Sequence, residues 1–211
     1  MHETQLQDKF LIPFFRESLG YQEIKANTVT NSLIIEEDLQ AFISTTELNQ
    51  KPYETLLKKY SGNAQQLLAA LIELIQERVA SSRNMALFIN ANKTVTLQGI
   101  KLHLFYTDDS VIHDSKLFEK NIFSVVQELP YKYNYQDKQI FSFRPDLCLF
   151  VNGIYLGYSE LKSNLSDQTA RKMDEAKSSK TTSALSKPIT KPLITISYSA
   201  IKRKITTAKT S

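Results

Sequence analysis

One stretch of the sequence, residues 143–162, constrains the fold more than any other. It reads FRPDLCLFVNGIYLGYSELK, and two apolar runs in it flank Asn152-Gly153. Asn-Gly between apolar runs is the strongest short-range signal for a β-hairpin, because the favoured two-residue turn needs a positive φ at both positions. The stretch is therefore predicted to form two antiparallel strands. Asp146 opens the first strand, and Glu160 and Lys162 close the second.

Three ionisable side chains are thereby brought to the open end of the hairpin. Because side chains alternate faces along a strand, Glu160 and Lys162 point the same way and Leu161 points to the opposite, buried face. Two carboxylates and an ammonium group on one surface suit a hard cation such as Mg²⁺, which takes oxygen ligands. Asp146 and Glu160 are the predicted ligands, and Lys162 would orient a water or neutralise developing charge. The competing interpretation is a surface hairpin with ordinary solvated charges.

The two carboxylates can share a cation only if the hairpin is irregular. With a regular two-residue turn Asp146 would face Ser159, and Glu160 would point to the other side of the sheet. A three-residue loop would pair Asp146 with Tyr158 instead, and a bulge farther along either arm would serve equally. We predict one of these irregularities. The carboxylates should then lie roughly 4 to 5 Å apart, given metal–oxygen distances of about 2.0 to 2.1 Å.

Pro145-Asp146 followed by Glu160-Leu161-Lys162 resembles the PD-(D/E)xK nuclease motif. The longer stretch FRPDLCLFVNGIYLGYSELKSN is similar to part of the N-terminal nuclease domain of type I restriction enzyme R subunits. The resemblance covers roughly residues 1 to 172. It implies an α/β, restriction-endonuclease-like fold, with a central mixed β-sheet, flanking helices and a catalytic β-hairpin. It also implies Mg²⁺-dependent hydrolysis of DNA, with specificity and modification subunits as the other partners. The alternative is a nuclease-fold module that binds DNA or assembles with these subunits without cutting.

The resemblance suggests auxiliary positions as well. Arg144 would contact phosphate or support Asp146. The family continues into a helix with a Gln-x-x-x-Tyr element, in which Gln168 matches but Lys172 stands at the position of the tyrosine. Nucleases of this class often carry an acid on the first helix near the metal, and Glu3 or Glu17 could fill that place. Each is otherwise a solvated helix charge.

Periodicity predicts helices in the first half of the chain and strands in the second. The predicted helices are Glu3–Leu19, interrupted at Pro13 and ended by Gly20; a helix capped by Asn31 or Ser32 and running through Phe42; one with Pro52 in its first turn; and Ala64–Val79. The predicted strands are Thr94–Leu97, Ile100–Tyr106 and one within Asn121–Tyr135. Short helices and a small sheet around the hairpin are expected.

Composition and the distribution of charge limit where DNA could bind. The chain has 211 residues, a 42% apolar content that allows a real core, and a formal net charge of +4. Of its 26 lysines and arginines, eight lie from Lys177 onward, where there is no acidic residue, so residues 1–176 carry 18 basic and all 22 acidic side chains. A DNA footprint must therefore be a local patch beside the hairpin.

Cys148 is the chain's single cysteine, and it is interpreted as a packed core thiol in a reducing cytoplasm. No stretch approaches the roughly 18 to 20 consecutive apolar residues of a membrane span, so no membrane contact is expected.

Two regions are predicted: a nuclease-like domain over residues 1–175, and a basic tail rich in Ser, Thr and Lys over residues 176–211. The tail is expected to be disordered, or to be out of frame after about Met173 in a truncated R-subunit gene; a native basic tail for nucleic acid is the alternative. No Gly-x-x-x-x-Gly-Lys-Ser/Thr occurs, so the chain has no phosphate-cradling loop. ATP is expected only for the full-length family, which carries a motor.

Overall fold

The computed structural model describes residues 7–82, 85–107, 115–135 and 138–161. Its centre is a four-stranded mixed sheet in the order β1-β4-β7-β8. The strands are β1 (Gln22–Ile24), β4 (Phe123–Gln127), β7 (Leu147–Val151) and β8 (Ile154–Ser159); β1 runs parallel to β4, and the other neighbours are antiparallel. Two hairpins stand apart from it, β2 (Thr94–Leu97) with β3 (Ile100–His103), and β5 (Tyr131–Tyr135) with β6 (Lys138–Phe143). The mixed α/β class agrees with the prediction.

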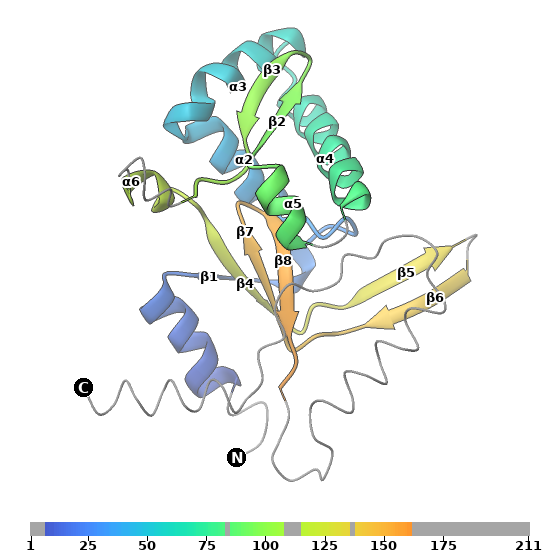
Figure 1. Ribbon diagram of the computed structural model, residues 1–211. Helices are drawn as coiled ribbons and strands as arrows, with labels where there is room; N and C mark the ends of the chain where they lie inside the picture. Colours follow the sequence, from blue (N-terminus) through green and yellow to red (C-terminus); the bar gives the residue numbers. More distant parts are fainter. Residues whose placement is uncertain (1–6, 83–84, 108–114, 136–137, 162–211) are drawn as a thin grey trace.

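Helices flank the sheet at both ends of the hairpin β7–β8. Four helices lie with β2–β3 at one end: α2 (Glu36–Thr45), α3 (Glu47–Lys59), α4 (Ala64–Ser81) and α5 (Met85–Ala91) (Figure 1). The first helix lies at the other end. A short helix, α6 (Ser115–Phe118), precedes β4. That helix is wound as π-helix over η1 (Gln7–Leu11) and η2 (Phe14–Ser18) on either side of Pro13, and a short 3₁₀ turn, η3 (Ala26–Thr28), follows β1. None of the described helices is long and apolar enough to cross a bilayer.

Most predicted elements are confirmed, and the differences have physical reasons. The helix α4 begins at Ala64 as predicted, with the Asn63 side chain accepting a hydrogen bond from Gln66 N. The helix expected from Asn31 or Ser32 begins only at Glu36, because the preceding residues bridge to the sheet instead. Pro52 lies inside α3 rather than in its first turn. The segment Asn121–Tyr135 holds two strands, β4 and β5, rather than one.

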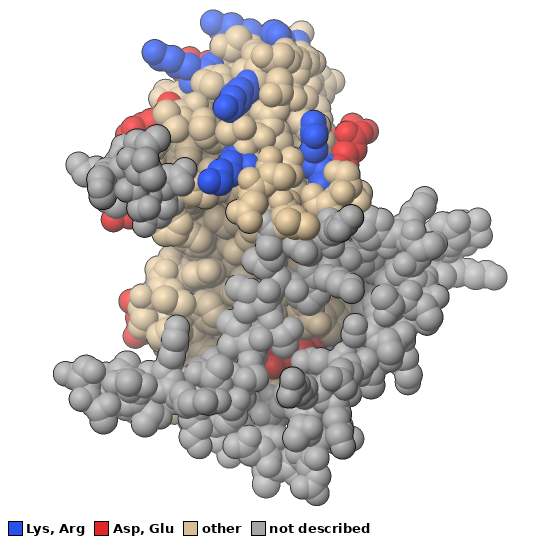
Figure 2. All heavy atoms as spheres, in the orientation of Figure 1, with Lys and Arg blue, Asp and Glu red and all other residues tan. Residues whose placement is uncertain are grey.

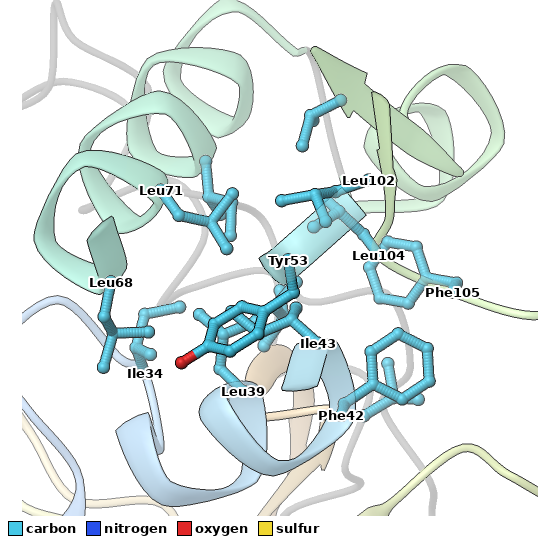
Figure 3. Close-up of a cluster of buried hydrophobic side chains, with 14 of the residues drawn as sticks. Ile34, Leu39, Phe42, Ile43, Tyr53, Leu68, Leu71, Leu102, Leu104 and Phe105 are labelled. Atoms are coloured by element: carbon cyan, nitrogen blue, oxygen red, sulfur yellow. The ribbon is translucent and has the colours of Figure 1, made fainter. Parts of the chain in front are cut away.

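The largest apolar core fills the space between the helices and the turn end of the hairpin. Side chains from α2, α3, α4 and the segment after β3 point toward one another (Figure 3). Val151 and Ile154, the last residue of β7 and the first of β8, belong to the same cluster. Two smaller clusters cover the sheet: Leu11, Ile12 and Phe15 pack with Leu147, Leu149 and Leu161, whereas Ile35 and Leu129 pack with Cys148 and Phe150. The hairpin is thus inserted into the protein at its turn.

The turn itself is buried and hydrogen-bonded on every side. Asn152 and Gly153 have φ values of 50° and 76°, as a type I′ turn requires. The Asn152 side chain, 0% exposed, accepts from Ile122 N at 2.7 Å and donates to Leu104 O at 2.8 Å and to Asn121 Oδ1 at 2.9 Å. Each of its polar atoms is therefore satisfied, as burial demands.

Gly153 is fixed by contact as well as by conformation. Its carbonyl accepts from Ile35 N at 2.9 Å, and a Cβ at this position would lie 2.2 Å from Ile35 O and 2.8 Å from Leu39 N. These are backbone atoms that join the turn to the start of α2. Only glycine can be accommodated this close to the backbone of Ile35 and Leu39.

We predict that Gly153→Ala destabilises the protein by about 3 kcal/mol or more, because it adds a clash with backbone to the cost of a left-handed alanine. Gly99→Ala is a matched control: Gly99 has φ +79° with nothing within 4 Å of its virtual Cβ, so it should lose only about 1–2 kcal/mol. Urea unfolding measures both variants. Equal losses would show that the approach of Ile35 to Gly153 does not matter.

A buried carboxyl group joins α2 to the sheet. Asp38 is 6% exposed; its Oδ2 accepts from Ser124 Oγ at 2.5 Å and its Oδ1 from Gln22 Nε2 at 2.8 Å. Burial raises the pKa of Asp38, and the two hydrogen bonds offset only part of that rise. The folded state therefore holds the proton more tightly than the unfolded chain does.

Because the folded-state pKa of Asp38 is raised, the free energy of unfolding should fall as pH rises from the unfolded value of about 3.9 through the folded value. Asp38→Asn should remove the contribution of Asp38 to this decrease in the free energy of unfolding, since the amide does not titrate. Denaturant unfolding between pH 4 and 7 is the measurement, with Glu54→Gln as the control that removes one charge from an exposed position of α3. An unchanged pH profile in Asp38→Asn would contradict the assignment.

Candidate active site

The hairpin of β7 and β8 contains an irregularity between its turn and its open end. Val151 pairs with Ile154, so the turn has two residues. Farther along, Leu149 pairs with Gly157, which leaves Leu156 as an extra residue in β8. This is a β-bulge, in which two residues of one strand oppose one of the other. The predicted irregularity is confirmed in the form of a bulge in one arm.

The alternative prediction of a three-residue loop is wrong. It would have paired Asp146 with Tyr158, whereas Tyr158 pairs with Cys148. The reason lies in the turn, because the contacts of Asn152 and Gly153 require a tight two-residue connection. The extra residue is therefore accommodated within β8.

The bulge changes which face the end of β8 presents. Tyr155 and Tyr158 are three residues apart, a spacing that puts side chains on opposite faces of a regular strand. Both nevertheless pack against the cluster that contains Cys148 and Phe150. Leu161 packs in the cluster on the other face, with Leu147 and Leu149. Beyond the bulge the alternation has shifted by one residue.

Asp146 and Glu160 are the next residues outward from the last pair of the hairpin, Leu147 with Ser159. Since cross-strand partners share a face, this register puts the two acidic residues on one face of the sheet. Leu161 N donates a hydrogen bond of 2.5 Å to Asp146 Oδ2. The carboxylate of Asp146 is thereby tied to the end of β8 that carries Glu160. The separation of the two carboxylates stays a prediction.

The main chain of Asp146 is held by two further hydrogen bonds. Its carbonyl oxygen accepts from Gln7 Nε2 at 2.9 Å and from Glu128 N at 3.0 Å. Gln7 Nε2 also donates to Gln127 Oε1 at 2.8 Å. The first helix and the end of β4 therefore both reach the start of β7.

Arg144 lies two residues before Asp146, and its guanidinium is 3.8 Å from the carboxylate of Glu128. Both side chains are exposed, at 65% and 58%. An exposed pair of this kind contributes little stability, typically below about 1 kcal/mol. Arg144 can therefore leave Glu128 at small cost, and its contact with phosphate stays a prediction.

Several predicted site residues lie outside the described residues. They are Lys162 and Gln168 after the hairpin, and Glu3 near the N-terminus. Glu17 is described, and it is exposed on η2. The predicted boundary between residues 175 and 176 also lies outside. The predicted roles of these residues therefore stay predictions.

The sequence analysis did not identify Gln7, which binds Asp146, or Gln127, which accepts a hydrogen bond from Gln7. Gln7 stands four residues before Leu11, so it occupies the apolar face of the first helix, and a polar residue there was an available signal. Gln127 ends β4, where nothing in the sequence links it to residues more than a hundred positions away. Only the parallel pairing of β1 with β4 and the docking of the first helix bring these side chains together.

The residues at this end of the hairpin fit a magnesium ion. Mg²⁺ is usually held by one or two carboxylates, with waters and substrate phosphates completing its six oxygen ligands. Asp146 and Glu160 would be such a pair. Within the described ranges no group of three or more His, Cys, Asp or Glu residues could hold a metal. Cys148 is 1% exposed, and burial raises the pKa of its thiol to about 12, so the thiol is protonated at neutral pH.

Comparison with known proteins identifies the family. The model of the type I restriction enzyme R protein N terminus matches residues 1–193 of the 211, and so extends beyond residue 172, the expected end of the resemblance. No curated protein and no solved structure matches the chain. The matched residues include the whole hairpin with Asp146 and Glu160. The chain therefore belongs to the family of type I restriction enzyme R protein N-terminal regions.

Proposed function

We propose that this chain carries the DNA-cleaving centre of a type I restriction enzyme R subunit, acting by Mg²⁺-dependent hydrolysis of phosphodiester bonds. The observation that carries the proposal is the bulge at Leu156, because it brings Asp146 and Glu160 to one face of the sheet. A solvated surface hairpin has no need of this register. The family membership supports the same function.

In this proposal Asp146 and Glu160 hold the cation through their carboxylate oxygens. Bound there, Mg²⁺ would polarise the scissile phosphate and lower the pKa of a water molecule. The hydrogen bond from Leu161 N keeps the Asp146 carboxylate beside Glu160 before any ligand arrives. Such preorganisation avoids a rearrangement at the moment of reaction.

Lys162 and Arg144 complete the proposed centre with positive charge. Lys162 would position the attacking water or stabilise the charge that builds up on the phosphate. Arg144 would exchange its exposed partner Glu128 for a DNA phosphate, to which its planar guanidinium can bind through two hydrogen bonds. Gln168 is a proposed auxiliary residue on the strength of the family pattern alone.

The proposed DNA path includes the helical end of the molecule. Figure 2 shows several lysine and arginine side chains, with acidic side chains among them, at the end of the molecule where the helices lie. Lys58 and Lys59 end α3, and Lys59 Nζ donates to Gln98 O, so the end of α3 adjoins the β2–β3 turn. Such positive side chains can bind DNA phosphates without reading sequence. The specificity and modification subunits of the enzyme would supply the recognition of sequence.

Titration of the whole chain with Mn²⁺, followed by calorimetry, tests the metal site. Asp146→Asn and Glu160→Gln should each reduce the Mn²⁺ affinity by more than about 100-fold, since loss of an outer-shell partner alone costs about 10–100-fold. Lys162→Ala should leave Mn²⁺ binding intact and reduce plasmid nicking by about 100-fold or more, if nicking is measurable with the wild type. Glu73→Gln, at an exposed position of α4, is the control for loss of one negative charge.

Unchanged Mn²⁺ affinity in Glu160→Gln would refute the metal site. Mn²⁺ binding that depends on both carboxylates, without any nicking by the wild-type chain, would support the alternative of a module that assembles with other subunits and does not cut alone.

A further inference from the structure

Gln7 is a buried amide at the first described residue of the N-terminal helix. It is only 5% exposed, although it lies on the face that packs its neighbours Leu11 and Phe15 against the sheet. Burying an amide costs free energy unless hydrogen bonds replace those lost to water. Gln7 recovers them from residues 120 and 139 positions away, at Gln127 Oε1 and Asp146 O. Its partners include the residue on which the proposed centre depends.

Together these contacts fix Asp146 at three points. Gln7 Nε2 and Glu128 N bind its carbonyl oxygen, and Leu161 N binds its carboxylate. Glu128 itself has φ +47°, a conformation that a non-glycine residue adopts only at a cost. The strained residue thus directs its N–H to the same carbonyl that Gln7 binds.

The contact of Gln7 is part of a longer series of polar side chains. Gln127 Nε2 donates to Glu23 Oε1 at 2.7 Å, and Glu23 lies 3.8 Å from Arg16 on η2. The helix is therefore attached to the sheet through both of its halves, by Gln7 in η1 and by Arg16 in η2. The exposed Arg16–Glu23 pair adds little to this attachment, so the packing of Leu11, Ile12 and Phe15 against the sheet is what limits how far Gln7 can move away from Asp146.

We propose that Gln7 is a positioning residue, which holds the main chain of Asp146 so that its carboxylate stays beside Glu160. The proposal rests on the metal site of the proposed function. A neutral amide suits this role because it donates to the carbonyl without adding a positive charge that would compete with the cation. A lysine or arginine at this place would bring such a charge, and an ionised carboxylate would have no proton to donate.

Two variants remove the donor. Gln7→Leu keeps an apolar helix face and roughly the same volume, and Gln7→Glu keeps the shape while losing the N–H groups at neutral pH. Gln40→Leu is the matched control, because Gln40 Nε2 makes one hydrogen bond of 2.7 Å to Tyr53 Oη within the helical end of the molecule. Thermal unfolding verifies that each variant is folded under the assay conditions.

The first readout needs no metal. Amide hydrogen exchange of the whole chain should speed up at Leu161 and Glu128, which donate to Asp146, by about tenfold or more in both Gln7 variants. The amide of Ile35, which donates to Gly153 O, should exchange as in the wild type. In Gln40→Leu all three amides should keep their wild-type rates.

The second readout is the Mn²⁺ affinity of Gln7→Leu, which should fall by about 10–100-fold, as expected when the partner of a metal ligand is lost. Unchanged exchange at Leu161, or an Mn²⁺ affinity no weaker than that of Gln40→Leu, would refute the role of Gln7 and leave the proposed function standing. A wild-type chain that binds no Mn²⁺ would refute the proposed function itself.

Discussion

The buried turn at Asn152-Gly153 is the constraint on which the rest of the structure depends. Gly153 lies so close to the start of α2 that no side chain fits between them, and the Asn152 side chain makes hydrogen bonds to two separate segments, at Leu104 and at Asn121–Ile122. A turn held in this way cannot lengthen. The surplus residue of the hairpin therefore appears within β8, as the bulge at Leu156. The geometry of the open end thus follows from contacts at the opposite end.

The two ends of the hairpin serve different purposes. Its turn end lies in the large apolar core between the helices, where burial fixes the position of both strands. Its open end carries half-buried polar residues that are held by individual hydrogen bonds. A rigid support with a polar end is what a centre that binds a cation and a phosphate needs, because its ligands must keep their positions when water is displaced. One pair of strands thus joins the apolar core to the proposed metal site.

The hairpin and its acidic residues could be predicted from the sequence, because an Asn-Gly turn and alternating faces are local rules. The need for an irregularity could also be predicted, because in a regular hairpin with a two-residue turn Asp146 and Glu160 would lie on opposite faces of the sheet. Its place could not be predicted, since it depends on Ile35 and Leu39, which approach Gly153 from far away in the sequence. The same applies to Gln7 and Gln127, whose partners lie across the sheet. The predicted start of α2 is too early, because Ile34 bridges to Ile154 of β8 and Ile35 bridges to Val29 instead of continuing a helix.

The hydrogen bond between Gln7 and Asp146 joins residues 139 positions apart, and the pairing of β1 with β4 also joins segments far apart in the sequence. Contacts of such sequence separation form only after most of the chain is available. While the protein is being synthesised, its first helix and first strand must wait for β4 and β7 to leave the ribosome. The candidate centre is therefore assembled only after the hairpin has been made, and a nascent chain that ends before β8 does not yet hold Asp146 and Glu160 together.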